Sequence, residues 1–245
     1  MILYFSATGN SRYVAERIAK ATDDEATSVV GLLERGETAF SDDVIGVVSP
    51  TYYWTLPTVT RDFLQVASLD APYLFYVATY GVSPGGSALH AGQCLGRPFD
   101  ARFSVRMPDT WTPAFDLSTT EAVARFTTTT EDDISEAISH VSERDRGDFA
   151  HKEMPALAAA LGRRLYDRAR QTKNLHVTDA CVGCGLCARK CPVHAIEMRG
   201  GRPTWVKDRC AMCLGCLHRC PKFAIQYGNG KTAEHGQYLN PHVRA

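Results

Sequence analysis

The sequence has no apolar run close to the ~18 residues that a membrane span needs. Its apolar opening, Met1 to Phe5, leaves no room for the charged leader of a signal peptide. We therefore expect a soluble, cytoplasmic protein without a membrane span. The chain also lacks the biased composition of disordered, collagen-like or coiled-coil proteins, because 44% of its 245 residues are hydrophobic and 22% are charged.

The chain has no net charge, but its charges are unevenly distributed. Residues 1–172 carry 16 basic and 23 acidic side chains, whereas residues 173–227 carry 9 basic and 3 acidic ones. Such asymmetry is typical of two separate units. We predict a domain over 1–172, a smaller domain over 173–227, and a tail over 228–245 that is loosely ordered or binds a partner. The basic residues of the second unit are scattered among cysteines, so nucleic acid is not an expected partner.

Cysteine is nearly absent outside one short segment. Of nine cysteines, only Cys94 lies outside the span from Cys181 to Cys220, and we expect it to be a buried small hydrophobe. In a cytosolic protein such a dense cluster indicates metal binding rather than disulfides. The segment also repeats itself after 29 residues, as Cys181, Cys184, Cys187, Cys191 and Pro192, and then as Cys210, Cys213, Cys216, Cys220 and Pro221.

Each copy reads C-x2-C-x2-C-x3-C-P, the spacing of a bacterial [4Fe–4S] run. Three closely spaced thiolates bind three irons of one cubane, and the fourth cysteine reaches the neighbouring cluster. This rule predicts two ligand sets, Cys181, Cys184, Cys187 and Cys220 for one cluster, and Cys191, Cys210, Cys213 and Cys216 for the other. Two zinc sites are the alternative, although zinc sites usually separate their cysteine pairs by roughly a dozen residues or more. His194 and His218 occupy non-ligand positions, so we expect solvated side chains.

The segment from Leu175 to Tyr227 resembles the dicluster bacterial ferredoxins at all eight cysteines. The resemblance implies two [4Fe–4S] clusters and electron transfer. Unlike many such ferredoxins, the segment is basic. Positive charge beside an anionic cluster stabilises its reduced state, so we expect comparatively high reduction potentials.

The first 170 residues alternate short apolar runs with helical patterns. The runs of strand length are Ile2–Phe5, Val44–Val48, Leu74–Ala78 and Ala101–Arg106, with a weaker one near Glu25–Val30. The helical patterns cover Ser11–Lys20, Val59–Ala67, Ser87–Leu95, Glu131–Val141 and Met154–Arg170. Strands that alternate with helices predict an α/β fold with a doubly wound parallel sheet.

Two common phosphate-binding motifs are missing. Neither G-x-G-x-x-G nor G-x4-G-K-[ST] occurs, which disfavours dinucleotide and P-loop nucleotide binding. Instead, the loop Ser6-Ala7-Thr8-Gly9-Asn10-Ser11 joins the first strand to the first helix without any Lys or Arg. Hydroxyls and free N–H groups at a helix N-terminus suit a phosphate dianion. An ordinary capped turn is the alternative.

Two further loops follow later strands, at the sheet edge where ligands of such folds bind. The loop Pro50–Pro57 has three consecutive aromatic residues, Tyr52-Tyr53-Trp54, which a flat ligand would explain. The loop Thr79–Gly86 has glycines that allow a close backbone approach. An ordinary surface turn explains either loop alone. No Asp, Glu, His, Lys or Cys occurs from Val44 to Thr60, so the aromatic loop offers no obvious catalytic acid or base.

With these three loops the chain resembles the flavodoxins, whose [ST]-x-T-G-x-[ST] FMN-phosphate loop matches the segment from Ser6 to Ser11. The resemblance implies a sheet of order 2-1-3-4-5 and an FMN cofactor. The residues that it assigns to FMN binding are Ser6, Thr8, Gly9, Asn10, Ser11, Pro50, Thr51, Tyr52, Tyr53, Trp54, Thr79, Tyr80, Gly81 and Gly85. A departure is Ala7, where flavodoxins often have glycine.

The whole chain is similar to flavodoxin–ferredoxin fusion proteins, which implies an electron-transport flavoprotein with FMN and two clusters. We expect redox proteins as donor and acceptor, and a homodimer is a further possibility. The alternative is an FMN-dependent oxidoreductase with a small-molecule substrate, in which Arg106, Asp109 and Trp111 build a pocket over the flavin. No Asp or Glu lies between Asp43 and Asp62 or between Asp70 and Asp100, so we expect a less negative flavin potential than in acidic flavodoxins.

Overall fold

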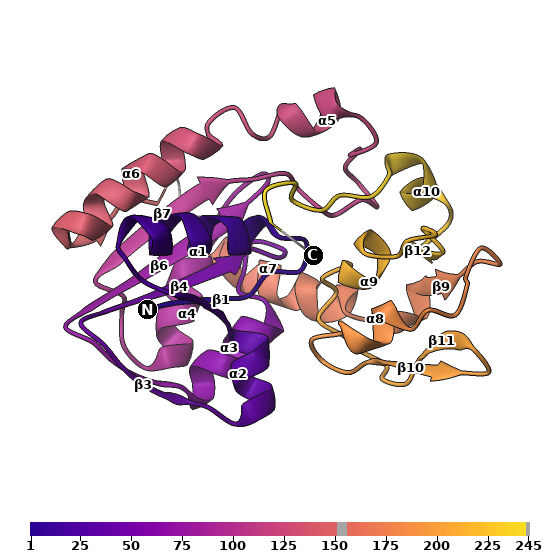
Figure 1. Cartoon of the computed structure of the whole chain (residues 1–245), viewed down its shortest axis with the longest axis horizontal. Helices are drawn as coiled ribbons and strands as arrows, with labels where there is room; N and C mark the ends of the chain where they lie inside the picture. The colour runs from indigo at the N-terminus through magenta and orange to yellow at the C-terminus, as the bar shows by residue number, and fades with distance from the viewer. Residues whose placement is uncertain (151–155, 244–245) are drawn as a thin grey trace.

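The computed structural model describes residues 1–150 and 156–243, with side chains described for 1–150 and 160–243. Figure 1 shows two units, a larger one built around a sheet and a smaller one that carries the last third of the chain. Met154, which opens one of the predicted helical patterns, lies outside the described residues. Among the described helices none is long and apolar enough to cross a membrane.

The larger unit is a parallel sheet in the order β2-β1-β4-β6-β7-β8. Its strands are β1 (Ile2–Tyr4), β2 (Ala26–Ser28), β4 (Val44–Pro50), β6 (Tyr73–Tyr80), β7 (Ala101–Arg106) and the two-residue β8 (Gly147–Asp148). The five main strands follow the predicted order 2-1-3-4-5, so the predicted fold class is confirmed. Their carboxyl ends lie along one edge, where the three singled-out loops emerge.

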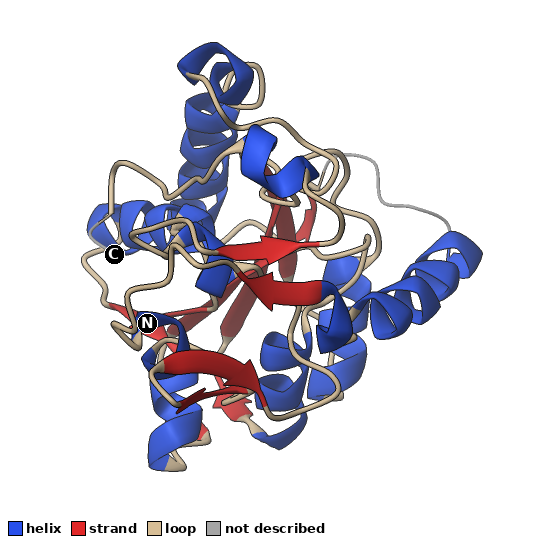
Figure 2. Ribbon diagram, turned by 90° about the vertical axis from the view of Figure 1, so that its right-hand side faces the viewer, coloured by secondary structure: helices blue, strands red, loops and turns tan. Residues whose placement is uncertain are grey.

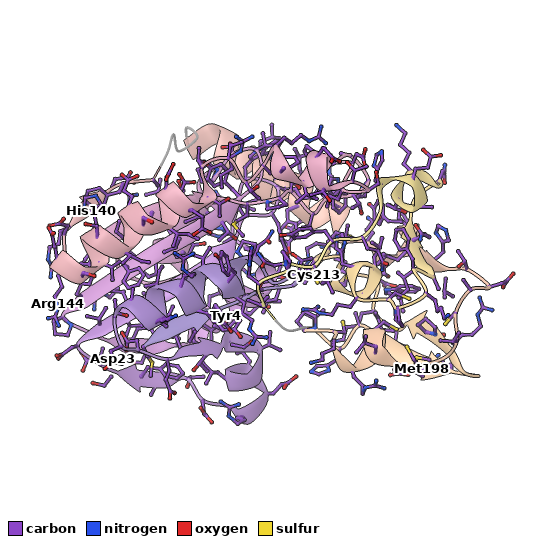
Figure 3. The ribbon with its side chains drawn as sticks, turned by 45° about the horizontal axis from the view of Figure 1, so that its top comes forward. Tyr4, Asp23, His140, Arg144, Met198 and Cys213 are labelled. Carbon is purple, nitrogen blue, oxygen red and sulfur yellow. The ribbon has the colours of Figure 1, made fainter. Side chains whose placement is uncertain are left out.

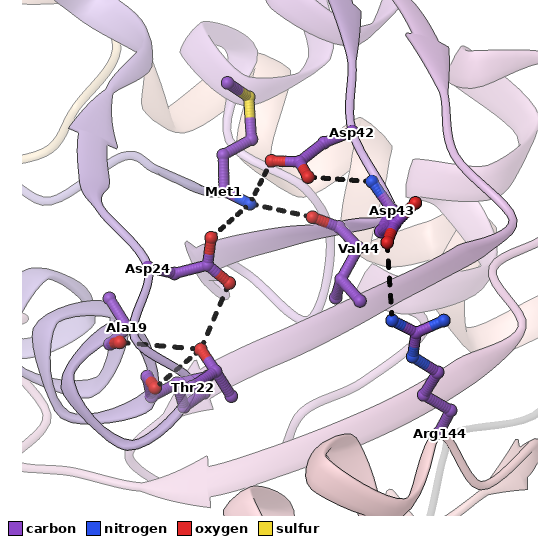
Figure 4. Close-up of polar contacts among 9 residues, drawn as sticks. Met1, Ala19, Thr22, Asp24, Asp42, Asp43, Val44 and Arg144 are labelled. Carbon is purple, nitrogen blue, oxygen red and sulfur yellow. Dashed lines mark hydrogen bonds and ion pairs between the residues drawn. The ribbon is translucent and has the colours of Figure 1, made fainter.

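The N-terminus is tied to the edge opposite these loops (Figure 4). The Met1 ammonium group lies 2.9 Å from Asp24 Oδ1 and 2.8 Å from Asp42 Oδ2 and donates to Val44 O at 2.7 Å. These contacts join the starts of β1 and β4 and the turn after α1. They hold the central strand β1 in register from its first residue.

Helices cover both faces of the sheet (Figure 2). One face is covered by α1 (Asn10–Ala21) and α6 (Thr130–Glu143), whose Val14, Ile18 and Ile134 pack against the sheet. The other face is covered by α2 (Val29–Arg35), α3 (Thr58–Val66) and α4 (Ser87–Leu95). Both cores are apolar, and burial of this surface is the main force that holds the layers together.

Some elements of this unit were not predicted. They are α2, α5 (Thr120–Ala124), and a small parallel pair of β3 (Ala39–Ser41) with β5 (Ser68–Asp70). All are short, and α5 and β3 expose most of their residues, so no apolar period marks them. Cys94, predicted to be buried, is half-buried at the end of α4 beside the core.

The smaller unit follows α7 (Ala156–Ala169) and a 3₁₀ turn at Thr172–Asn174. It contains two antiparallel pairs, β9 (Leu175–Val177) with β12 (Ile225–Tyr227) and β10 (Ile196–Arg199) with β11 (Arg202–Trp205), which is the predicted hairpin. Each of the two short helices, α8 (Leu186–Arg189) and α9 (Gly215–His218), contains the third cysteine of its copy, Cys187 or Cys216. A last helix, α10 (Lys231–His235), follows β12.

The expectation of a loosely ordered tail is wrong for the described residues 231–243. After α10 the chain returns to the larger unit, where Tyr238 and Asn240 are buried. The Asn240 N–H donates to Thr8 O at 2.8 Å, and the Tyr238 hydroxyl donates to Asn10 Oδ1 at 3.0 Å. The tail therefore packs on the first loop of its own chain.

Candidate functional site

A cavity of about 390 Å³ opens at the carboxyl ends of β1, β4, β6 and β7. Its volume falls within the range of cavities that bind small molecules and cofactors. All residues predicted to bind FMN line it, except Gly9 and Gly85. Further lining residues are Ala7, Val82, Ser83, Met107, Pro108, Asp109, Thr110, Trp111, Phe115, Met212, Cys213 and Leu214.

The first loop presents backbone donors and hydroxyls to the cavity. Gly9 has a φ of 100°, and its N–H donates to Ser6 Oγ at 3.1 Å. Asn10 and Ser11 open α1, so their N–H groups lack the carbonyl four residues earlier that later helix residues use. The Ser11 hydroxyl bonds to Thr79 Oγ1 at 2.7 Å, which links this loop to the end of β6. The arrangement fits the phosphate group of a flavin nucleotide.

Two predicted residues, Gly9 and Asn10, also contact the tail behind the loop, and of the two only Asn10 lines the cavity. A side chain at Gly9 would meet Val243 and Asn240 of the tail at 2.7 and 2.8 Å, so glycine is needed for the tail to approach. The Asn10 amide is used by the protein itself, because its Nδ2 donates to Pro108 O at 3.1 Å and its Oδ1 accepts from Tyr238 and Asn240. Asn10 therefore orients the loop.

The aromatic loop is held in a strained conformation. Tyr53 and Trp54 have φ angles of 50° and 61°, a region that costs non-glycine residues free energy. Gly85 explains how the loop is held, since a Cβ there would lie 2.2 Å from Trp54 O. The neighbouring Gly86 N–H donates to the same oxygen at 2.9 Å. Gly85 thus supports the aromatic loop from behind, and it is not a lining residue of the cavity.

The aromatic residues differ in exposure. The Tyr52 side chain is half-buried, and burial together with the nearby Cys213 raises its pKa. Burial raises the pKa of Tyr53 to about 12, and its ring lies 6.0 Å from Tyr166 of α7 in a stacked arrangement. Trp54 stays 37% exposed at the mouth of the cavity. The loop therefore reaches from the solvent to the second unit.

One carboxylate lies among the lining residues, and it comes from the loop after β7. Asp109 packs against Gly81, where a Cβ would lie 2.2 Å from Asp109 Cβ. Burial raises the pKa of Asp109, although its Oδ1 accepts a hydrogen bond from the Trp111 N–H at 3.0 Å. Arg106, expected beside it, is not a lining residue; its guanidinium lies over the Phe126 ring at 5.9 Å.

The inner wall of the cavity comes from the second unit. Met212, Cys213 and Leu214 line it, and Met212 and Leu214 are buried with φ angles of 49° and 52°. The equivalent residues of the first copy are Gly183 and Gly185, with φ angles of 68° and 72°. We did not predict this wall from the sequence. The sequence signal that could have indicated this wall is the replacement of two glycines of the first copy by Met and Leu in the second, at positions with left-handed backbone angles.

The eight cysteines surround two small apolar cavities. One is lined by Cys191, Cys210, Cys213 and Cys216, which we call the proximal group because Cys213 also lines the large cavity. The other is lined by Cys181, Cys184, Cys187 and Cys220, which we call the distal group. In each group three cysteines come from one copy of the motif and the fourth from the other copy.

The thiol environments fit iron–sulfur clusters. Burial raises the pKa of Cys210 to about 12 and that of Cys216 well above its ordinary value, so these thiols need bound metal to become thiolates. Within residues 1–150 and 156–243, no three His, Cys, Asp or Glu side chains lie close enough to share one metal ion. Cubane ligands are spread farther apart, because each thiolate binds a different iron.

His218 was expected to be solvated, and this is wrong. It is 2% exposed, its Nε2 lies 2.9 Å from Thr110 O, and its Nδ1 accepts the Tyr238 N–H at 3.1 Å. Burial lowers its pKa to about 4. His218 therefore joins α9 to the loop after β7 and to the tail. His194 is exposed as expected.

The fold and the site define a flavodoxin-like unit joined to a dicluster ferredoxin unit (Figure 3, where Cys213 marks the junction). The flavodoxin domain model matches residues 1–135, more than half of the chain, and a 4Fe-4S dicluster domain model matches residues 180–225. The chain belongs to the flavodoxin domain family and continues into a dicluster domain, which confirms the resemblance. These domains indicate a flavin, two [4Fe–4S] clusters and electron transfer.

A comparison with solved structures finds matches over part of the chain. The Trp repressor binding protein from Bacillus subtilis is 12% identical over 57% of this chain and 94% of that chain, with a TM-score of 0.34. A flavodoxin from the domain Archaea is 17% identical over 57% of this chain and 97% of that chain, with a TM-score of 0.32. A comparison with curated proteins finds no match.

Proposed function

We propose that this protein carries electrons between two [4Fe–4S] clusters and FMN within one chain, and onward to a redox partner. The observation that carries the proposal is the shared wall: Cys213 lines both the large cavity and the cavity of the proximal group. A cluster on the proximal group would then be separated from a flavin by little more than the backbone of Met212–Leu214. Such closeness favours direct transfer, with no second subunit required.

The distal group supplies the contact with the outside. Cys184 is exposed and Val182 beside it is 61% exposed, whereas the equivalent Ala211 is buried. The route we propose therefore runs between a partner at the distal cluster, the proximal cluster and FMN. The partner in this proposal is another redox protein, because a cluster near the surface exchanges electrons without any bound substrate.

FMN is the proposed flavin because the first loop offers a site for one phosphate. Ser6, Ser11 and the N–H groups at the start of α1 would bind it by hydrogen bonds and by the helix dipole. When bound, FMN supplies one- and two-electron chemistry. The protein orients it between the aromatic loop and Gly81.

The test begins with anaerobic reconstitution, which should yield one FMN and two cubanes per chain. We expect Cys191→Ala to damage the cluster of Cys210, Cys213 and Cys216 and to leave the other intact, as judged by EPR of the reduced protein. Loss of the cluster of Cys181, Cys184 and Cys187 instead would overturn the crossed ligand sets. Cys94→Ala is the matched control, because Cys94 lies at the end of α4 and outside both groups.

Flavin reduction by a reduced ferredoxin then tests the route. Stopped-flow absorbance should show at least tenfold slower flavin bleaching in Cys191→Ala than in the wild type or in Cys94→Ala. Equal rates in all three proteins would show that electrons reach the flavin without the proximal cluster.

A second candidate is an FMN-dependent oxidoreductase that reduces a small molecule with electrons from the clusters. The observation in its favour is Asp109, a partly buried carboxyl group at the cavity whose raised pKa suits a proton donor. Bleaching of the flavin by NAD(P)H alone would favour this enzyme. Bleaching only by reduced ferredoxin or dithionite would favour the carrier.

A further inference from the structure

A second cavity, of about 410 Å³, lies behind the first loop. The flavodoxin side of its wall comes from β1, the loop Ser6–Gly9, α1 and α2, and the ferredoxin side from the end of α8 and from Arg219. Tyr4 and Cys213, labelled in Figure 3, lie on the two sides. We call this cavity the basic cleft after four of its lining residues, Arg12, Arg189, Lys190 and Arg219.

Positive charge dominates the basic cleft. Glu34 is the one carboxylate among its lining residues, and it lies 3.7 Å from His194. Arg12 forms an ion pair with Glu16 at 2.7 Å, and Arg189 donates to Cys184 O at 2.9 Å. The other two cations are differently placed, because within the described residues neither the Lys190 ammonium group nor the Arg219 guanidinium has a side-chain hydrogen bond or ion pair.

Arg219 is the informative side chain, because it is partly buried. Its guanidinium nitrogens are not among the buried polar atoms that lack a partner, so they remain accessible from the cleft and are free to bind an anion that enters it. Arg219 lies near Cys213 and Tyr52: burial raises the pKa of both groups, and the positive charge of Arg219 partly opposes that rise. The anionic proximal cluster would satisfy part of this charge. Lys190, on the other repeat, lines the same cleft.

The remaining wall is apolar and closed by the tail. Val30, Pro192, Leu239 and Val243 line it. The hydrogen bond from the Asn240 N–H to Thr8 O holds the tail in place. An apolar wall opposite a cationic one fits an organic molecule that carries phosphate.

The basic cleft is not the site that we propose for the FMN phosphate. Asn10, Ser11 and Thr79 line the flavin cavity but not the cleft, whereas Gly9 and Arg12 line the cleft but not the flavin cavity. The loop Ser6–Gly9 separates the two, and the tail covers its outer side.

We propose that the basic cleft binds the phosphate groups of a small anionic ligand, with Arg219 as the principal contact. Charge-assisted bonds from arginine to phosphate are among the stronger and more specific polar contacts in proteins. Because Cys191 and Cys213 also line the cleft, the ligand lies beside the proximal group. Its negative charge opposes the charge that a cluster gains on reduction, so binding and reduction weaken each other reciprocally.

The experiment measures binding to the reconstituted holoprotein by titration calorimetry, with inorganic pyrophosphate and ADP as the two probes. We expect saturable binding at one site and at least tenfold weaker binding to Arg219→Gln. Arg219→Lys should keep most of the affinity because it keeps the charge. Arg168→Gln is the matched control: Arg168 is exposed on α7 and is not a lining residue of the cleft.

Several results would overturn the proposal. They are the absence of binding by both probes, an equal loss in Arg219→Gln and Arg168→Gln, and displacement of FMN by either probe. If ADP binds more tightly than pyrophosphate, the ligand belongs to the class of organic phosphates. If the two probes bind with equal affinity, that class is overturned in favour of inorganic pyrophosphate. Flavin content and cluster EPR of each variant show that it has folded.

The redox part rests on the proposed clusters and is tested separately. Binding to the dithionite-reduced holoprotein should be at least threefold weaker than to the oxidised form. Equal affinities would refute the reciprocal effect but leave the site itself standing. Failure of flavin reduction through the clusters would leave the calorimetric result unchanged, so the two proposals fail independently.

Discussion

Non-glycine residues with left-handed backbone angles lower the stability of this fold locally. Met212 and Leu214 each adopt a conformation that costs a non-glycine residue about 1 kcal/mol. The first copy of the motif avoids this cost with Gly183 and Gly185. The strain is retained where the side chains close the flavin cavity, which agrees with the tendency of strained residues to lie at functional sites.

Gly85 allows a test at a single residue. Alanine at this position would place a Cβ 2.2 Å from Trp54 O in addition to the cost of its φ of 61°. We expect Gly85→Ala to displace the aromatic loop and to weaken FMN binding at least tenfold, as measured by flavin fluorescence in titrations of flavin-free protein.

Gly96 provides the matched control for Gly85. It has a similar φ of 79°, but nothing lies within 4 Å of its Cβ position. Gly96→Ala should cost about 1 kcal/mol of stability from backbone strain alone and leave FMN affinity unchanged. Equal FMN affinity in both variants would refute the role assigned to Gly85.

Among the elements, the tail has the most unexpected role, because it supports the first loop from 228 residues away in sequence. Tyr238→Phe removes the bond from its hydroxyl to Asn10 Oδ1 at 3.0 Å. We expect it to cost about 1 kcal/mol of stability and to weaken FMN binding several-fold, although Tyr238 is not a lining residue of the flavin cavity.

Tyr73→Phe is the control for the tail. It removes a similar single bond, from the buried Tyr73 ring to Asp145 O at 2.7 Å, at the opposite edge of the sheet. It should cost similar stability with no change in FMN affinity. A tail that only stabilises the fold would give the same FMN affinity in both variants.

His90, on helix α4, should make the stability of the fold depend on pH. Its Nδ1 lies 2.8 Å from Thr55 Oγ1 of the aromatic loop. Burial, with smaller contributions from Arg163 and Arg61, lowers the His90 pKa from 6.5 to about 4. The unfolded chain therefore binds a proton between pH 6.5 and 4 that the folded chain does not, so stability falls as the pH falls through this range.

The measurement is the urea midpoint followed by far-UV circular dichroism at pH 7.5 and pH 5. His218 contributes a fall of the same sign, since its pKa is also lowered to about 4. His90→Gln should therefore reduce the fall without abolishing it. His176→Gln, a substitution of an exposed imidazole on β9, should leave the fall unchanged. An unaltered fall in His90→Gln would contradict the assignment.

At the scale of the whole molecule, local sequence patterns predict the helices and strands, whereas contacts between residues far apart in sequence shape the functional site. The strand Ala101–Arg106 and the helix Ser87–Leu95 follow from their apolar patterns and flanking glycines and match the structure. The cysteine spacing likewise indicates the clusters. The tail on Asn10 and the wall at Met212 are absent from the prediction because each joins residues far apart in sequence.

Asp109, which the oxidoreductase alternative placed in a pocket over the flavin, also changes the argument about the flavin's charge environment. The sequence places no carboxylate in the two loops expected at the ring, which predicts a comparatively high flavin potential. The fold brings Asp109 from the next loop against Gly81. Its burial raises its pKa, so the charge that it adds to the cavity depends on pH.

The charge around the flavin also sets the order in which the cofactors are reduced. Reduction of FMN builds negative charge on the ring, and a carboxylate opposes it by about 1–2 kcal/mol at a separation of roughly 8–16 Å with an effective dielectric constant near 20. A single carboxylate has less effect than the several in acidic flavodoxins. We therefore expect the flavin to reach full reduction at potentials close to or above those of the clusters in this protein. A dithionite titration followed by visible absorbance tests this, and full flavin reduction only after both clusters are reduced would contradict it.

Asp109→Asn separates the contribution of this carboxylate. Well above the Asp109 pKa the wild-type group is ionised, so the neutral asparagine should raise the flavin potential by tens of mV, the equivalent of about 1–2 kcal/mol. As the pH falls towards that pKa, the wild-type carboxylate becomes protonated and the difference between the two proteins should shrink. Asp116→Asn is the control, because Asp116 lies on the same connection but is not a lining residue of the cavity. A shift that stays constant with pH, or that also appears in Asp116→Asn, would show that Asp109 does not act through its charge at the flavin.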